Sequence, residues 1–452
     1  MTGGGRIRKE PIPGFTGTLA GFIVNTRASD IPADVFEHAK IAFLDWLGCA
    51  IAGARDPAVE KLIRYADVMG GEAQATIIGR GVRKTVSQAA LINGAASHVL
   101  DYDDTSTGYI GHPSVGMFPA LLALSEWRKM SGREFLTSAV VAYKVASVIG
   151  ACVGKEQYDA GWHTTSTIGH IASAAGCARL LGLDKRQTVY SLGLAGTMSS
   201  GLKIVFGTMT KAFHAGNACR GGLTAALLAR DDFTCAPDFM EGNMGYIHAY
   251  KGRIDEKKTA TLGKTWGFEE LAPKFHASCH FTHSAIESLL KVVAEEKLSP
   301  SDIRGICVHV SRLALDAAGK TEPKTALEGK FSIPYCLANA LLRGDTGLQS
   351  FTDVKVNDPE VKSFMEKISL SLDEKLAPME ARITLETNAG AVYGRSSDVF
   401  REIPPLETKR VRIINKFLAI CEPLPGEDVR RIVDAVLALE RMTGMDHLFS
   451  LF

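Results

Sequence analysis

The sequence predicts two structural regions, a large all-α domain and a smaller α+β domain. Up to about residue 230 the chain consists of Ala-, Gly- and Leu-rich stretches that are apolar on most sides, as in helices buried inside a large bundle. After about residue 265, apolar and polar residues alternate, which is typical of strands. We therefore expect an all-α domain over residues 1–267, rejoined by residues 399–452, and an α+β domain over residues 268–398.

The first well-marked helix is predicted within residues 29–53. Ser29 or Asp30 can cap it, and Pro32 falls near its first turn. Further buried helices are predicted in stretches of the same character, over residues 86–101, 116–130, 133–154, 165–182, 185–201 and 217–233. Their many small residues allow neighbouring helices to approach closely.

The second region contains both strands and helices. Strands are predicted around Ile306, Val308 and Val310, around Ile368, Leu370 and Leu372, and as a hairpin over residues 381–396. Asp358 can cap a helix that begins at Pro359. Residues 426–442 are predicted to be helical again.

Composition argues against several classes of partner. Among 452 residues, Lys and Arg total 51 and Asp and Glu total 50, so no basic excess points to nucleic acid. No apolar run approaches the length of a membrane span, and the longest candidate, residues 137–154, carries Lys144 and is expected to be a buried helix. The nine scattered cysteines and the lack of an apolar leader favour a cytoplasmic protein with reduced thiols.

Five polar clusters interrupt the apolar pattern. Together they supply carboxylate, imidazole, ammonium and phenol groups, which suit general acid–base chemistry on an anionic substrate. They are Asp101, Asp103, Asp104, Thr105 and His112; His163 and His170; Lys211, His214 and Arg220; Lys274, His276, Cys279, His280 and His283; and Lys330 and Tyr335. No glycine-rich nucleotide motif accompanies them, and no cofactor is expected.

Each cluster also has a structural interpretation. Asp101 or Asp103 can cap a helix, His163 can be a hydrogen-bonded core imidazole, and Tyr335 can be a core ring with one hydroxyl partner. His276, His280 and His283 are spaced along one helical face and offer a possible zinc site. No independent second ligand motif appears, so we expect no metal.

Taken together, the clusters resemble the MmgE/PrpD family along nearly the whole chain. The matching segments are residues 91–114, 160–170, 206–222, 274–283 and 329–345, in that order. The family contains 2-methylcitrate dehydratase, cis-aconitate decarboxylase and iminodisuccinate epimerase. The resemblance implies an all-α domain with an α+β lid domain, a homodimer, and a metal-free active site in the cleft between the domains.

By this resemblance, the catalytic residues are Asp101, His112, His163, Lys211 and Tyr335. Thr105, Lys274 and Cys279 match substrate-binding positions, and we add Arg220 as a further cation for substrate. Two positions depart from the known activities. The decarboxylases have His where Cys279 stands, and the dehydratases have Asn where Asp103 stands. Residues 160–170 and 206–211 look most like the epimerase-type members.

These residues predict a cofactor-free lyase that acts on a small di- or tricarboxylate. His163 or His112 would remove a proton next to a carboxylate, and Asp101 would orient an imidazole. Lys211, Lys274 and Arg220 would bind the substrate carboxylates, while Tyr335 or the other imidazole would protonate the leaving hydroxyl. Dehydration is the first expectation. An epimerase of a substituted succinate is the alternative, and a decarboxylase comes third.

Overall fold

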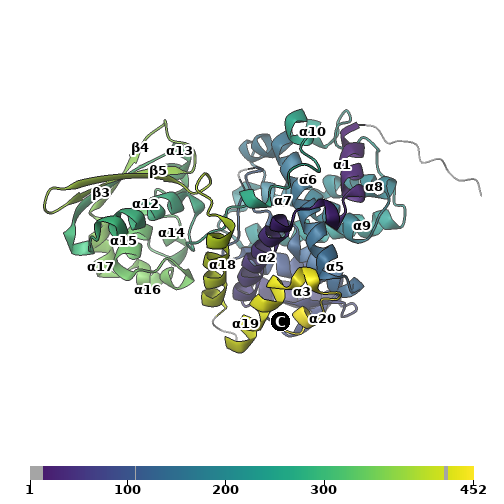
Figure 1. The fold of residues 1–452 in the computed structure, drawn as a ribbon, viewed down its shortest axis with the longest axis horizontal. Coiled ribbons are helices and arrows are strands. Elements are labelled where there is room, and N and C mark those ends of the chain that lie inside the picture. Colours follow the sequence, from purple (N-terminus) through teal and green to yellow (C-terminus); the bar gives the residue numbers. More distant parts are fainter. Residues whose placement is uncertain (1–13, 107, 422–425) are drawn as a thin grey trace, which may run out of the picture. The chain divides into compact units, whose positions relative to one another are not determined.

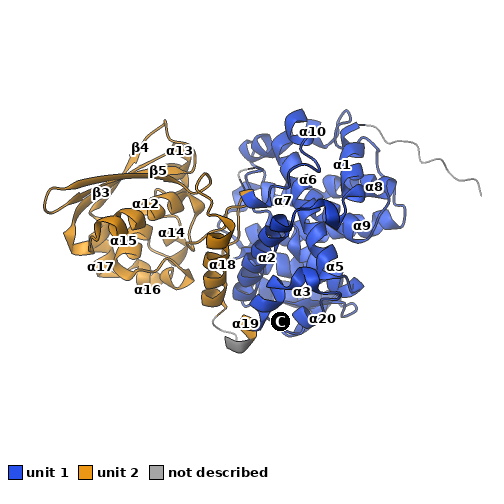
Figure 2. Ribbon diagram, in the orientation of Figure 1, with its two compact units in different colours: residues 1–99, 106–269, 431–452 blue, residues 100–105, 270–430 orange. Residues whose placement is uncertain are grey.

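The computed structural model describes residues 14–106, 108–421 and 426–452. These residues form two compact units, which Figure 2 shows in different colours. Unit 1 comprises the described residues up to Val99, then Ser106–Glu269 and Arg431–Phe452, whereas unit 2 comprises Leu100–Thr105 and Glu270–Arg430. We expected no apolar leader at the N-terminus, and this expectation concerns residues 1–13, which lie outside the described ranges.

Unit 1 is built almost entirely from helices. Its longer helices are α1 (Gly14–Asn25), α2 (Ala33–Gly53), α3 (Pro57–Met69), α4 (Val86–His98), α5 (Phe118–Arg128), α6 (Gly132–Asp159), α7 (Thr164–Leu180), α8 (Lys185–Met198) and α9 (Met209–Arg230). Its short helices are α10 (Tyr246–Ala249), α11 (Glu256–Thr259) and α20 (Asp446–Phe449). A two-stranded hairpin, β1 (Ala75–Ile77) and β2 (Val82–Lys84), lies inside the region that we expected to be all-α.

The centre of unit 1 is a layer of closely packed helices. α7 packs against α6, α8 and α9, and α4 packs against α9, α2 and α5. Glycine allows α4 and α9 to approach closely, because a Cβ atom on Gly94 of α4 would lie 2.6 Å from the Cα atom of Gly216 in α9. This contact matters for the site, because α4 ends at His98 and α9 carries Lys211 and His214.

Unit 2 contains a four-stranded mixed sheet. The strands are β3 (Ile303–Val310), β4 (Ile368–Leu372), β5 (Glu380–Thr387) and β6 (Val392–Asp398) in the order β4-β3-β5-β6. β3 pairs parallel with β4 and antiparallel with β5, and β5 pairs antiparallel with β6. α12 (His280–Glu296) packs on β5 and β6, and α15 (Ile333–Arg343) packs on β4 (Figure 1).

The remaining helices of unit 2 flank this layer. They are α13 (Arg312–Ala318), α14 (Ala326–Gly329), α16 (Asp353–Val356), α17 (Pro359–Met365) and α18 (Leu406–Ile420), and α19 (Gly426–Leu437) crosses the boundary between the units. We expected residues 399–452 to rejoin the first domain, but residues 399–430 belong to unit 2. The side chains of α18 explain this assignment, because Lys409 donates to the Leu271 carbonyl and Arg412 pairs with Glu287.

The local sequence signals mark most elements of unit 2. Ile306, Val308 and Val310 are buried in β3 and their neighbours are partly exposed, so the predicted alternation is confirmed. The predicted hairpin is β5–β6, and Asp358 accepts hydrogen bonds from the first backbone N–H groups of α17, as expected. In unit 1, however, α2 begins at Ala33 with Pro32 as its N-cap, because Asp30 closes a preceding 3₁₀ turn instead.

One described helix is long and apolar enough to span a membrane by composition alone. It is α6, and 94% of its most apolar window is buried inside the protein.

The glycine contact between α4 and α9 is testable. Gly94→Ala places a methyl group against the α9 backbone, so we expect the free energy of unfolding to fall by about 1–3 kcal/mol. Chemical denaturation followed by circular dichroism would measure the change. Gly21→Ala in α1 is the control, because its nearest new contact is Lys185 Cε at 3.9 Å and alanine favours helix. Equal losses in both variants would contradict the packing argument.

Candidate active site

The segment that follows α4 carries the acidic cluster. Asp101 adopts a left-handed backbone conformation with φ of 52°, which few residues other than glycine tolerate. Asp103 and Asp104 follow and are buried. Buried carboxylates need compensating charge or hydrogen bonds, so the surroundings of this segment define what it can do.

Lysine ammonium groups of unit 2 bind this segment through its backbone. Lys330 donates to the Leu100 carbonyl at 2.9 Å, Lys274 to the Asp101 carbonyl at 2.7 Å, and Lys416 to the Tyr102 carbonyl at 2.7 Å. We call Lys274, Lys330 and Lys416 the lysine clamp. Lys274 also lies 3.1 Å from Asp101 Oδ1, so the predicted substrate-binding lysine is ion-paired with the predicted catalytic aspartate.

Thr105 is fixed by both its backbone and its side chain. Its N–H and C=O pair with the C=O and N–H of Ala272, each at 3.0 Å. Its hydroxyl lies 2.8 Å from His280 Nδ1, at the start of α12. The threonine that the family resemblance assigns to substrate binding is therefore held at one orientation within unit 2.

Unit 1 gathers four histidines, which we call the imidazole group: His98, His112, His163 and His214. The ring centroid of His98 lies 4.7 Å from the ring centroid of His112 and 5.9 Å from that of His163. The Nδ1 atoms of His163 and His214 are 3.2 Å apart, so one carries a proton that the other accepts. Three other pieces of chain thus converge on His163.

Local structure sets the direction of the two predicted catalytic imidazoles. His163 is the N-cap residue of α7, and its backbone N–H donates to the Gly201 carbonyl at 2.9 Å. The backbone N–H of His112 donates to Thr165 Oγ1 in the first turn of the same helix at 3.1 Å. The start of α7 therefore positions both residues.

Burial controls the protonation of two members of the imidazole group, His163 and His214. His163 is 3% exposed, and burial, followed by the charges of His98 and Lys211, lowers its pKa well below the usual value. Burial and then His98 also lower the pKa of His214. Desolvation penalises the imidazolium form, so His163 is neutral at neutral pH and available to accept a proton.

Of the predicted cations in unit 1, Lys211 lies near His163. Its ammonium nitrogen is 5.5 Å from the Phe206 ring centroid, and that ring lies 4.9 Å from the His163 ring. Arg220 is further along α9, where it donates to Asn217 Oδ1 at 2.6 Å and its charge lowers the pKa of His170. The structure places Arg220 beside His170.

The other two predicted residues belong to unit 2. Cys279 is the N-cap residue of α12, and its backbone N–H donates to the Lys330 carbonyl at 2.8 Å. Tyr335 is completely buried in α15, its hydroxyl donates to the Ser350 carbonyl, and burial raises its pKa. This is the arrangement of a core ring with one hydroxyl partner, which the sequence had left as the alternative.

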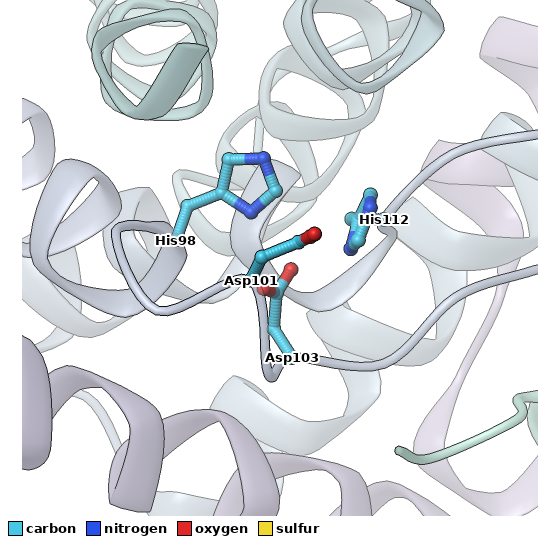
Figure 3. A group of neighbouring side chains, drawn as sticks. All are labelled: His98, Asp101, Asp103 and His112. Carbon is cyan, nitrogen blue, oxygen red and sulfur yellow. The ribbon is translucent and has the colours of Figure 1, made fainter. Parts of the chain in front are cut away.

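Residues of the continuous segment 98–112 also form a group of possible metal ligands. His98, Asp101, Asp103 and His112 each offer one donor atom, and these atoms all lie within 4.8 Å of one another (Figure 3). Two imidazoles and two carboxylates suit a divalent cation, and the same groups suit proton transfer.

The zinc alternative at His276, His280 and His283 is not supported. Among the described residues, these three histidines form no group of donor atoms close enough to share an ion. His276 lies 2.7 Å from Thr346 Oγ1, and His283 lies 3.4 Å from the Ser278 carbonyl. α12 begins at His280, so His276 is outside the helical face that the spacing suggested.

Models of two protein domains match this chain. The MmgE/PrpD N-terminal domain matches residues 17–257, and the MmgE/PrpD C-terminal domain matches residues 276–441. This chain belongs to the MmgE/PrpD family. The family resemblance read from the polar clusters is therefore confirmed.

This family member is similar to decarboxylases, a decarboxylase-like protein and dehydratases over most of their length. A cis-aconitate decarboxylase-like protein of Aspergillus oryzae is 29% identical over 98% of this chain and 98% of its own. Cis-aconitate decarboxylase of Mus musculus is 26% identical over 94% and 90%. The 2-methylcitrate dehydratase of Salmonella typhimurium is 24% identical over 91% of each chain. These relatives are lyase-type enzymes.

From the sequence, we assigned no role to four residues whose contacts are described above. His98 ends a helix, and His214 and His280 stood in polar clusters without an assigned role. Lys416 lies on α18 in an ordinary amphipathic pattern. The one available signal was a lysine on the face of α18 that the helical pattern buries, which is unusual for lysine. In the structure Lys416 is 7% exposed.

His170 makes the stability of unit 1 depend on pH. Its Nδ1 donates to the Ser166 carbonyl at 2.8 Å, and burial lowers its pKa from 6.5 to about 4. Below its normal pKa the unfolded chain binds a proton that the folded chain refuses, so acid favours unfolding. Between about pH 7 and about pH 5, we expect His170→Asn to lose about 2 kcal/mol less stability than the native protein.

Urea denaturation of both proteins at each pH would measure this difference. A constant offset between them reports only the cost of the substitution. Parallel losses of stability with acid would show that His170 does not carry the proton linkage.

Proposed function

We propose that this protein is a lyase that acts on a small di- or tricarboxylate by moving a proton at the carbon next to a carboxylate. The observation that carries the proposal is His163, a buried neutral imidazole among three other imidazoles, in a chain of the MmgE/PrpD family. The reaction that we place first is dehydration of a hydroxy tricarboxylate such as 2-methylcitrate.

His163 is the proposed base. A low pKa makes it a weak base in the free protein, because burial, and then the nearby His98 and Lys211, disfavour its positive charge. A bound polycarboxylate reverses the local field, since its negative charges stabilise imidazolium and attract the Lys211 ammonium group. Substrate binding itself therefore raises the proton affinity of His163 at the moment when it is needed.

The elimination step uses two groups. His163 takes the proton from the carbon next to a carboxylate, and the C–H electron pair becomes the new C=C bond. The C–O bond on the adjacent carbon breaks, and the departing hydroxyl takes a proton to leave as water. We assign this proton to His112, which Asp101 approaches within segment 98–112 (Figure 3). Thr105 and Lys274 are the proposed carboxylate contacts from unit 2.

Decarboxylation is the second candidate. It is favoured by the relatives of 26–29% identity, whose names are cis-aconitate decarboxylase or a protein like it. In this reaction a C–C bond breaks, CO₂ leaves, and the electron pair left on the substrate takes a proton from an imidazolium. Cys279 stands where the resemblance places a histidine in those enzymes, which is why we place dehydration first.

Proton NMR in D₂O distinguishes these reactions. The purified protein would be incubated with 2-methylcitrate, citrate and cis-aconitate in separate samples. A new signal from a methyl group on a double bond in the 2-methylcitrate sample, or new olefinic C–H signals in the citrate sample, mean dehydration, and loss of a carboxylate with deuterium at the new C–H position means decarboxylation. Deuterium at the carbon next to a carboxylate without net conversion means epimerisation. Absence of all three across polycarboxylates would contradict the proposed function.

His163→Asn tests the base directly. We expect kcat to fall by about 10²–10⁴-fold, because the neutral imidazole that accepts the proton is lost. His170→Asn is the matched control, since His170 is also a buried imidazole on α7 but lies beside Arg220. It should keep kcat within about threefold of the native protein. Equal losses in the two variants would indicate damage to α7 and not loss of a base.

A further inference from the structure

The backbone at residues 100–102 is held in an unusual way. These residues belong to no helix or strand, and their carbonyls accept hydrogen bonds from the lysine clamp. Charge-assisted hydrogen bonds of this kind are stronger than those between neutral groups. Lys416 is 7% exposed, and a buried ammonium group that donates to a backbone carbonyl is uncommon in proteins.

The clamp surrounds the most strained residue of the segment. Asp101 has a positive φ, and such a conformation persists only where the surroundings hold it. Lys330 binds the carbonyl before Asp101 and Lys416 binds the carbonyl after it. The two lysines come from different elements, the end of α14 and the middle of α18, so the segment is fixed from two directions.

The direction of the Asp101 carboxylate depends on this backbone. A carboxylate oxygen of Asp101 lies within 4.8 Å of donor nitrogen atoms of His98 and His112. If φ at Asp101 returned to the ordinary negative region, the side chain would leave from a different face of the chain. The lysines therefore act on the histidines through Asp101.

We propose that Lys330 and Lys416 are positioning residues, which lock the left-handed backbone of Asp101 and so aim its carboxylate at His98 and His112. This inference deepens the proposed function and rests on it for its catalytic consequence. Neither lysine needs to touch the substrate. Lys274 belongs to the clamp but is not included in this proposal, because its ammonium group pairs directly with the Asp101 carboxylate.

The chain offers a matched control on the same helix. Lys409 lies seven residues before Lys416 on α18, is 4% exposed, and donates to the Leu271 carbonyl at 3.3 Å. Lys409→Met therefore removes a buried ammonium–carbonyl bond of the same kind from outside residues 100–102. Lys416→Arg is the conservative variant, because it keeps both the charge and the donor.

The first experiment is hydrogen–deuterium exchange of the full chain, read on the amides of residues 100–104, because the N–H of Thr105 is bonded to Ala272 beside the Leu271 that Lys409 contacts. Lys416→Met and Lys330→Met should speed exchange there by about tenfold or more, whereas Lys409→Met and Lys416→Arg should stay within about threefold of the native protein. Equal exchange in Lys409→Met and Lys416→Met would overturn the proposal. This readout needs no substrate, so it decides the clamp even if the proposed function fails.

The second experiment measures kcat and KM on whichever substrate the NMR assay identifies. Lys416→Met should lower kcat by about 10–100-fold with KM within about threefold, because the aimed carboxylate acts on the histidines. In an Asp101→Asn background the same substitution should lower kcat by less than about threefold, since the group that it aims is already neutral. Multiplicative losses in the double variant would show independent effects and would overturn the positioning role.

Discussion

The ammonium–carbonyl bonds of the lysine clamp are the constraint on which the site depends. They explain why Leu100–Thr105 belongs to unit 2 although the residues on either side belong to unit 1. The clamp also offsets part of the cost of placing acids in this segment, because Lys274 pairs with the Asp101 carboxylate. A segment with this many acids would otherwise be a solvated loop.

A second constraint is the close packing of small residues in unit 1. Gly94 allows α4 to approach α9, and this contact places His98 and His214 around His163. The same dense packing removes water from His163 and His214, and this burial lowers the pKa of both imidazoles. Helix packing and the lowered pKa values of His163 and His214 therefore have one cause in this protein, because the residues that bring the helices together also bury these two imidazoles.

Local patterns predicted the elements whose signals are contained in a few residues. The alternation of Ile306, Val308 and Val310 and the Asp358–Pro359 cap are of this kind, and both are present. Contacts between distant segments left no such signal. Lys416 binds a carbonyl 314 residues away, and no periodicity in α18 announces that bond. Tyr335 matches a family motif, yet only the fold reveals that its hydroxyl donates to the Ser350 carbonyl.

The proposed use of the imidazole group suits elimination and decarboxylation equally well. Both reactions place negative charge on carbon next to a carboxylate, and both need one imidazole to give or take a proton. They differ in the bond that breaks. In dehydration it is a C–O bond, and in decarboxylation it is the C–C bond to a carboxylate. That bond is selected by the cations that hold the substrate carboxylates, because they set its rotation. In the proposed mechanism, Lys211 and Lys274 therefore select the reaction, while His163 supplies the proton transfer common to both.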